Sequence, residues 1–445
     1  MPYTEIGKTW SKLRLIAERA KGNPQLQFTS LAHLLDKEFL EDSYRHLKKG
    51  KAVGVDNVSW EDYGENLDAN LDGLLARLRS KSYKPIPAKR VYIPKNETEK
   101  RPLGISALEN KVVEQALAWV LGSIYEEDFL ECSYGFRQGR GCHQALKALN
   151  DLVTLQPTNH IVECDIKGFF DNVSHEWLLS FLRVRIADSS LLALVEKFLK
   201  AGYIDDRLLV RSEQGTPQGS ILSPTLANVF LHYVLDIWFE TVVKTHVQGF
   251  CGLVRYADDF VCAVQYAGDA ERIELALKRR FEKHGLEIHP TKSRRISFGR
   301  YERENAEKQG RRPNTFDFLG FTHHCGETRN GKFKVGRRTS RKKFVAKCKA
   351  MNDWLRETRN KVATKEWWKT LKAKLRGHYQ YYGVSENYAG VARFHKATVG
   401  MLHKWLNRRS QKRKMNWERF NHYLECYPLP KPKICHSFYG SPCVP

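Results

Sequence analysis

The chain lacks long hydrophobic runs, paired cysteines and internal repeats. No stretch of about 18 apolar residues occurs, so the sequence predicts no membrane-spanning helix. The segment from Met1 to Trp10 has no apolar core of the kind found in secretory leaders. Ten cysteines are scattered without paired spacing, and Cys164 and Cys262 lie inside apolar runs. These absences predict a cytoplasmic chain whose cysteines stay reduced.

Acidic residues are also in short supply. Lys and Arg number 74 against 50 Asp and Glu, which gives a formal charge of +24. Such an excess favours a polyphosphate partner, because each neutralised phosphate releases a condensed counterion. A basic protein without such a partner is the alternative. The 445 residues, 42% of them apolar, suffice for a large core divided among two or three domains.

Apolar residues at helical or alternating spacing predict the main elements. Predicted helices cover 31–47, 67–78, 109–124, 223–239, 344–355, 368–382 and 391–406. Predicted extended segments are 90–95, 160–166, 286–289 and 316–322, with a strand, a turn and a strand over 251–264.

From about residue 331 the character of the chain changes. The segment Gly336–Phe344 holds five cations in nine residues, and the helical patterns after it are apolar on one face and basic on the other. Aromatic residues interleave with these cations, which favours nucleic acid over a merely solvated charged face. The tail after Pro428 is rich in proline and is predicted to be irregular.

The strongest motif is Tyr256-Ala257-Asp258-Asp259, which lies between two apolar runs. A hairpin would place both carboxylates at its turn, at the edge of a sheet. Adjacent carboxylates repel each other unless cations neutralise them. The alternative is ordinary turn chemistry, in which Asp is common.

A second carboxylate, Asp165, ends the apolar strand candidate that begins at His160. Carboxylates on separate strands can converge at one edge of a sheet. Mg²⁺ needs only one or two of them together with substrate phosphate, and two such ions stabilise both the attacking and the leaving oxygen of phosphoryl transfer. Taken alone, Asp165 would be better explained as the cap of a helix or turn.

The third motif is the loop from Gln214 to Pro224. Gly215 and Gly219 allow the backbone to approach another group closely, and a helix begins soon afterwards. An ordinary Gly/Pro loop capped by serine is the alternative.

Together these three motifs, in this order, resemble the reverse transcriptases. Further segments narrow the resemblance, over roughly residues 25–440, to the proteins encoded by bacterial group II introns. They are Ile93–Lys95, Arg101–Ile105, Ser133–Arg137, Gly285–Lys292, Phe318–Phe321 and Gly377–Tyr382.

The resemblance implies an α+β right-hand polymerase with fingers, an antiparallel-sheet palm and an α-helical thumb or maturase domain. Residues 1–60 would form a helical extension contacting template or RNA, and 61–335 the fingers and palm. Residues 336–420 would form the thumb, and 421–445 an irregular tail without an endonuclease domain, since no Cys-x-x-Cys pair occurs.

The resemblance also assigns roles to single residues. Asp165, Asp258 and Asp259 would be catalytic, and with Ile166 would hold two Mg²⁺ ions, for which Mn²⁺ can substitute. The expected deoxynucleotide contacts are Lys95, Arg101, Phe170 and Gln218, with Lys292 as the acid that protonates pyrophosphate. The expected template and primer contacts are Tyr256, Pro217, Gly219, Arg337, Arg338 and Arg341.

Two of these roles have a physical basis and a plain alternative. A ring at Phe170 would clash with a ribose 2′-hydroxyl and so select deoxynucleotides, unless it merely packs in the core. Lys95 and Arg101 offer a point charge and a forked donor to a triphosphate, unless they belong to a solvated basic loop.

The implied activity is DNA synthesis from deoxynucleoside triphosphates on an RNA template, starting from a DNA primer. A structured intron RNA would be a further partner, through splicing assistance. Two alternatives stay open: a polymerase freed from any intron, serving repair or defence, and an RNA-binding splicing cofactor without polymerase activity. The acids at 165, 258 and 259 disfavour the last, because a pure binding protein has no use for mutually repelling carboxylates.

Overall fold

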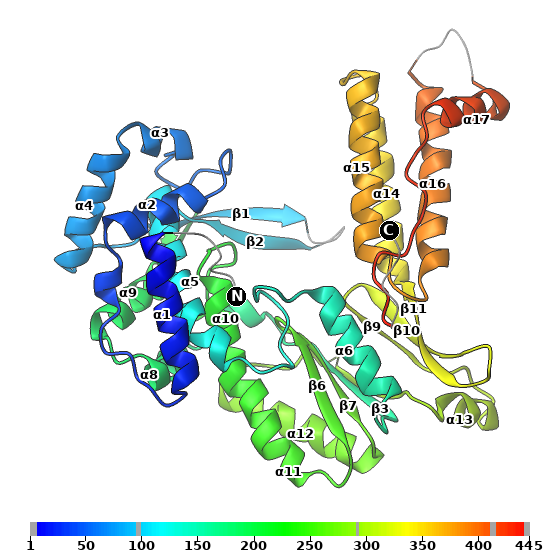
Figure 1. The fold of residues 1–445 in the computed structure, drawn as a ribbon, viewed down its shortest axis with the longest axis horizontal. Helices are drawn as coiled ribbons and strands as arrows, with labels where there is room; N and C mark the ends of the chain where they lie inside the picture. Colours follow the sequence, from blue (N-terminus) through cyan, green and yellow to red (C-terminus); the bar gives the residue numbers. More distant parts are fainter. Residues whose placement is uncertain (1–6, 95–98, 291–292, 410–414, 440–445) are drawn as a thin grey trace. The chain divides into compact units, whose positions relative to one another are not determined.

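The computed structural model describes residues 7–94, 99–290, 293–409 and 415–439. The chain packs as two compact units (Figure 1). The first is drawn from Met1–Ala145, Val162–Cys262 and Gly268–Arg294, and the second from Leu146–Ile161, Ala263–Ala267 and Arg295–Pro445. The mixture of helices and antiparallel sheets, followed by a helical region, confirms the predicted fold class.

The first unit begins with short helices. They are α1 (Lys8–Gly22), η1 (Ala32–Leu34), α2 (Lys37–His46), α3 (Trp60–Glu65) and α4 (Leu67–Arg79). The single helix predicted over 31–47 is wrong, because Asp36 interrupts it. The Asp36 side chain accepts a hydrogen bond from the Phe39 amide and so caps α2 as a separate helix.

A four-stranded sheet follows, with strand order β2-β1-β4-β5. Strand β1 (Ala88–Pro94) pairs antiparallel with β2 (Lys100–Ile105) and parallel with β4 (Tyr203–Asp205), which pairs antiparallel with β5 (Leu208–Val210). Helix α5 (Leu108–Asp128) comes directly after β2, and apolar side chains on several of its faces are fully buried. It is therefore a core helix rather than a surface helix.

The sheet that carries the acids has the order β6-β7-β3-β8. Strands β6 (Cys251–Tyr256) and β7 (Asp259–Val264) form a hairpin with β3 (His160–Cys164) beside β7 (Figure 1). Strand β8 (Arg294–Ser297) pairs on the other side of β3. The segment predicted as a strand over 286–289 contributes one antiparallel bridge, between Ile166 and Ile288.

Further helices flank these strands along the chain. They are α6 (Cys142–Thr154), α7 (Phe169–Asn172), α8 (His175–Arg185), α9 (Ser189–Lys200) and α12 (Ala267–Lys283). A longer helical run, Ser223–His246, is apolar and long enough to cross a membrane by length and composition, but two thirds of that stretch is buried inside the protein. Such burial is typical of a core helix.

That helical run is not uniform. It consists of α10 (Ser223–Leu231), two π-helical segments η2 (His232–Asp236) and η3 (Phe239–Val243), and α11 (Lys244–His246). A π turn inserts one residue into an α-helix and shifts the face on which later side chains lie. The sequence pattern predicted a plain helix here and gave no sign of the shift.

The second unit combines a small sheet with a helical bundle. Strands β9 (Thr315–Phe318), β10 (Phe321–Glu327) and β11 (Phe333–Thr339) form an antiparallel sheet in the order β11-β10-β9, and the tight turn Leu319-Gly320 joins β9 to β10. The single extended segment predicted over 316–322 is therefore the start of a hairpin. The helices are α13 (Glu302–Lys308), α14 (Arg341–Thr358), α15 (Thr364–Tyr382), α16 (Tyr388–Leu406) and α17 (Trp417–Cys426).

Helix α15 buries the stripe that its sequence predicts. Its buried side chains include Trp368, Leu371, Leu375, Tyr379 and Tyr382. Helix α17 occupies the start of the segment predicted to be irregular from residue 421. The Asn416 side chain caps it, and Phe420 is fully buried, so the irregular chain begins at Tyr427.

Candidate active site

The Tyr256–Asp259 motif forms the predicted hairpin. Tyr256 ends β6 and Asp259 begins β7, so Ala257 and Asp258 form a two-residue turn. Ala257 has a φ of 57°, a left-handed conformation that costs a residue with a Cβ about 1–2 kcal/mol. Surrounding contacts must therefore hold the turn.

Asp165 lies on the neighbouring strand in the sheet order, just beyond the end of β3. Its amide donates to the Ser293 hydroxyl at 3.1 Å, and its carbonyl accepts from the His289 amide at 2.8 Å. Burial and, after it, the Asp165 charge raise the pKa of Asp258, while the Arg101 and Arg255 charges act against them. Asp165, Asp258 and Arg101 therefore lie close enough to act on one another through space.

The site suits a divalent cation. Asp258 is half-buried, and its pKa is raised first by the cost of burying its charge and then by the neighbouring charge of Asp165. Within the described residues, no three His, Cys, Asp or Glu side chains gather closely enough to hold an ion by themselves. Two carboxylates together with water and substrate phosphate are the ligand set that Mg²⁺ accepts.

Asp259, Tyr256 and Ile166 differ from one another in exposure. Asp259 is exposed at the start of β7, and Tyr256 is half-buried, with its pKa raised by burial. Ile166 is buried and bridges Ile288. Its side chain is a hydrocarbon, so its main-chain carbonyl is its only potential ligand atom.

The Pro-Gln-Gly loop packs against β2. The Gly104 amide donates to the Gln218 carbonyl at 2.6 Å, and a Cβ on Gly219 would come within 2.5 Å of the Gly104 oxygen. Gly219 also has a φ of 111°, so both its conformation and its surroundings require glycine. Arg101, exposed on β2, thus lies on the strand that this loop contacts.

Phe170 lies beside the same loop. Its carbonyl accepts from the Thr216 amide at 2.7 Å, and a Cβ on Gly215 would meet the Phe170 oxygen at 2.9 Å. The Phe170 side chain is only half-buried, whereas Phe169 is 2% exposed and packs edge-on against Phe230. Phe169 is the core residue, and the half-buried Phe170 ring packs edge-on against it.

Comparison with known families decides the class of protein. The sequence pattern described as "Reverse transcriptase (RNA-dependent DNA polymerase)" matches residues 93–323, more than half of the chain. This stretch includes β2, the Pro-Gln-Gly loop, β3 and the β6–β7 hairpin. The chain belongs to the reverse transcriptase family.

Named relatives point to its group II intron branch. Protein YkfC of Escherichia coli K12 is 34% identical over 291 residues, which cover 57% of this chain and 74% of YkfC. The group II intron-encoded protein LtrA of Lactococcus lactis subsp. cremoris is 35% identical over 226 residues, which cover 50% of this chain and 37% of LtrA. A 91 kDa protein in the cob intron of Schizosaccharomyces pombe is 33% identical over 236 residues, 52% of this chain and 29% of that protein.

The reverse transcriptase thus spans only about a third of LtrA and less of the yeast protein. By the family pattern and these relatives together, it is a reverse transcriptase of the group II intron type. Members of the family generally use divalent metal ions.

Several predicted site residues are not among the described residues of the first unit. Lys95 and Lys292 lie outside the described residues. Arg338 and Arg341 are exposed in the second unit.

The prediction that Arg337 contacts template or primer is wrong. Arg337 is 1% exposed, donates to the Asn150 side chain at 2.7 Å and lies over the Phe438 ring. Side chains alternate along β11, so Arg338 points outward and is exposed, whereas the adjacent Arg337 points inward and is buried.

Sequence reasoning missed the groups that support the site. Arg255 is fully buried beneath the turn and is bonded to Asp236 and Asn228, which are themselves buried. Glu114 on α5 accepts from the Ser106 hydroxyl and from the Ile221 amide, and so ties the Pro-Gln-Gly loop to the core. A charged residue inside an apolar run was the available signal, because such residues are rarely buried unless paired.

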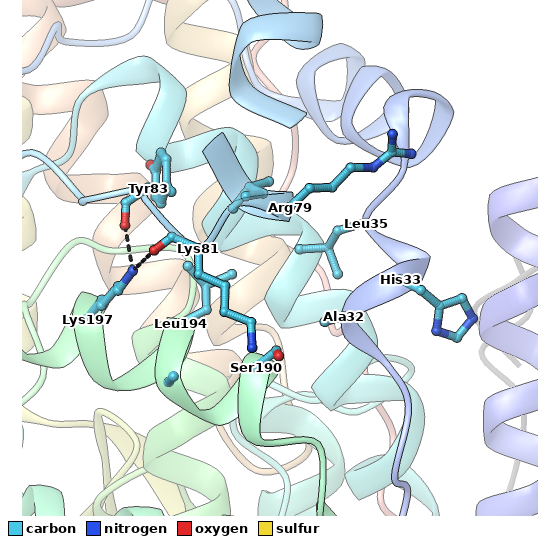
Figure 2. A pocket seen from close by; sticks show the side chains of 11 residues that line it. Ala32, His33, Leu35, Arg79, Lys81, Tyr83, Ser190, Leu194 and Lys197 are labelled. Atoms are coloured by element: carbon cyan, nitrogen blue, oxygen red, sulfur yellow. Dashed lines mark hydrogen bonds between the residues drawn. The ribbon is translucent and has the colours of Figure 1, made fainter. Parts of the chain in front are cut away.

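A separate cavity lies in the first unit, away from the acids. It has a volume of about 220 Å³ and lies between η1, the end of α4 and α9. Figure 2 shows Lys197 turned toward the carbonyls of Lys81 and Tyr83, to which it donates at 2.6 and 2.9 Å. Its lining is largely apolar, with Arg79, Lys81 and Lys197 but no acidic residue, so it is distinct from the acid-bearing site.

Proposed function

We propose that the protein extends the 3′-hydroxyl of a DNA primer with deoxynucleoside triphosphates on an RNA template. The observation that supports this best is the half-buried Asp258 at the hairpin turn, on which the Asp165 and Arg101 charges both act. Two carboxylates with a cation whose charge acts on one of them suit a metal-bound triphosphate, because the Arg101 charge offsets part of the negative charge.

In this proposal the chain mainly positions the reactants. Asp165 and Asp258 hold the ligand set for two Mg²⁺ ions, Asp259 completes the acidic cluster and the Ile166 carbonyl adds a main-chain ligand. Such ions, when bound, stabilise charge on the attacking and leaving oxygens. Arg101 contacts the triphosphate, Gln218 and Gly219 line the nucleotide and template pocket, and Phe170 excludes the 2′-hydroxyl.

The deciding experiment is primer extension on an RNA template. Asp258→Asn is expected to lower the extension rate at least about 1000-fold, because the neutral amide cannot replace a carboxylate ligand. RNA binding, measured by filter retention, should stay within about twofold. Asp68→Asn removes an exposed carboxylate on α4 and serves as the matched control. Near-normal extension by Asp258→Asn would refute the proposal.

A second activity, maturase assistance to an intron RNA, is favoured by the relatives and by the start of α14. Arg341, Lys342 and Lys343 occupy its first turn, with no acidic residue there, and all three are exposed. Cations are disfavoured at a helix N-terminus, where the macrodipole is positive. Phosphate would relieve that repulsion, so this turn is proposed as a nucleic-acid contact, with Arg338 beside it.

The two activities should separate. Asp258→Asn is expected to lose primer extension and to keep splicing. Variants at the start of α14 are expected to lose more splicing than primer extension. A splicing assay on a group II intron RNA with this protein measures the second activity. We place both activities in the cytoplasm, with RNA template, structured intron RNA, DNA primer and deoxynucleotides as partners.

A further inference from the structure

A buried network of charged and polar side chains lies directly beneath the acid-bearing turn. Arg255, the last residue but one of β6, is 0% exposed. Its Nε and Nη2 donate to the two oxygens of Asp236 at 2.7 and 2.5 Å, and its Nη1 donates to the Asn228 Oδ1 at 3.0 Å. The Asp236 carboxylate outweighs the effect of burial and keeps the pKa of Arg255 raised.

This network reaches the turn by two routes. Arg255 Nη1 also donates to the Ala257 carbonyl at 3.1 Å, and Ala257 is the turn residue with positive φ. Asn228 Nδ2 donates to the Gly135 carbonyl at 2.8 Å, and a Cβ on Gly135 would lie 2.2 Å from the Ala257 nitrogen. The turn is therefore held from below by Arg255 and on one side by the Gly135 backbone.

The π turn in the long helix makes the network geometrically possible. Asn228 and Asp236 are eight residues apart, a separation that rotates two side chains about 80° apart on a straight α-helix. The Ile237 amide instead donates to the His232 carbonyl, five residues back, which is the hydrogen bond of a π-helix. Each residue of η2 therefore rotates the chain about the helix axis by less than a residue of an α-helix does. Asp236 thereby returns toward the face of Asn228, and both meet Arg255.

The cost of this arrangement argues that it serves the site. A buried ion pair often contributes nothing to stability compared with well-packed apolar residues of similar volume. The pair is nevertheless aimed at a strained two-residue turn whose second residue is Asp258. Outer groups that orient metal ligands commonly change metal affinity 10–100-fold when they are removed.

We infer that Arg255, Asp236 and Asn228 are positioning residues that fix the Ala257–Asp258 turn and so set how tightly the acids bind divalent cations. This inference rests on the proposed function, because it takes Asp258 to be a metal ligand. It assigns to the π turn of the helix a role in the strength of the metal site rather than in folding alone.

The test replaces the pair without leaving a buried charge. The double variant Arg255→Met with Asp236→Leu is expected to keep the fold and to lose the bond to the Ala257 carbonyl. Arg185 and Asp128, an ion pair at 3.0 Å whose side chains are 2% and 13% exposed, supply the control. The matched control variant is Arg185→Met with Asp128→Leu.

Three quantities are measured on the protein bound to an RNA template and DNA primer. They are Mn²⁺ affinity by electron paramagnetic resonance without nucleotide, the Mg²⁺ midpoint of primer extension, and the thermal unfolding midpoint without metal. The Arg255 and Asp236 variant should bind Mn²⁺ at least about tenfold more weakly and need correspondingly more Mg²⁺, whereas the control should leave both unchanged. Unchanged Mn²⁺ affinity and Mg²⁺ midpoint would overturn the inference, whatever the unfolding midpoint.

Asn228→Leu decides the question if the double variant does not fold, since it removes one hydrogen bond to Arg255 and the tether to Gly135 but no charge. A smaller weakening of Mn²⁺ binding, about threefold or more, is expected from it, and none would overturn the inference. A different result is expected if the proposed function itself is wrong. In that case Asp258→Asn itself would keep wild-type Mn²⁺ affinity and extension.

Discussion

At the scale of single residues, the hairpin turn depends on space as much as on charge. Gly135→Ala would put a methyl group 2.2 Å from the Ala257 nitrogen, where backbone, not a flexible side chain, must move. We expect a loss of about 1–3 kcal/mol in the free energy of unfolding and at least a tenfold slower primer extension. Urea unfolding and single-turnover extension measure the two effects.

Gly122→Ala is the matched control for that change. Gly122 lies inside α5, and a Cβ there would meet nothing within 4 Å. Alanine favours a helix over glycine by up to about 1 kcal/mol, so this variant should be neutral or more stable, with normal extension. Equal damage from both variants would show that packing against the Ala257 turn is not special.

Substitutions at Phe169 and Phe170 should separate effects on stability from effects on nucleotide selectivity. Phe170→Ala is expected to increase ribonucleotide incorporation relative to deoxynucleotide by about tenfold or more, with little change in stability, because its ring is half-buried beside the Gly215 loop. Phe169→Ala removes a ring that is 2% exposed and should cost about 3–5 kcal/mol with unchanged selectivity. Competition assays with paired nucleotides, and thermal unfolding, distinguish these outcomes.

At the scale of elements, the first turn of α14 is a concentrated source of positive charge. Replacing Arg341, Lys342 and Lys343 with Gln is expected to weaken RNA binding and to flatten its salt dependence. Each lost phosphate contact lowers the slope of log affinity against log salt by about 0.7–0.9. Filter binding between 50 and 300 mM salt measures the slope.

A control for this variant removes as much charge from other helices. Lys147, Lys200 and Lys244 each form an ion pair with an acid one helical turn away. Their replacement with Gln takes away the same formal charge but no cation cluster. An equal change in slope for both triple variants would mean that net charge, not the α14 turn, governs binding.

At the scale of the whole molecule, buried histidines predict how stability responds to acid. Burial, aided by the Lys347 charge, lowers the pKa of His378 to about 4 from its ordinary value of 6.5. Between these two pH values His378 binds a proton in the unfolded chain but not in the folded protein. Stability from this group is therefore complete above pH 6.5 and falls as pH drops toward 4, by up to about 3 kcal/mol.

His378→Phe should reduce that loss, because phenylalanine takes up no proton and can stack on Phe394 as His378 does at 3.7 Å. Unfolding by urea at pH 7.5 and at pH 5 measures the difference. His422→Phe, at a histidine whose side chain is 79% exposed, should keep the wild-type pH dependence. An unchanged pH dependence in His378→Phe would contradict the proposed burial effect.

The sequence predicted much of this molecule, and its failures have physical causes. Helix α4, helix α15 and the β6–β7 hairpin follow directly from apolar spacing and a two-residue turn. Neither the burial of Arg337 nor the role of Arg255 could be predicted, because a charged residue in an apolar strand has no visible partner until the fold supplies one. Asp236, its partner here, comes from a helix whose π turn leaves no mark on hydrophobic periodicity.

The strand order β6-β7-β3-β8 also affects how the protein is made. Strand β3 ends at Cys164, and its sheet neighbour β7 begins only at Asp259, so a ribosome adding about 5–20 residues per second leaves β3 without either partner for roughly 5–20 seconds. Its apolar side chains and unpaired edge are exposed on the nascent chain throughout that interval. A holding chaperone present during translation is therefore expected to increase the yield of correctly folded protein.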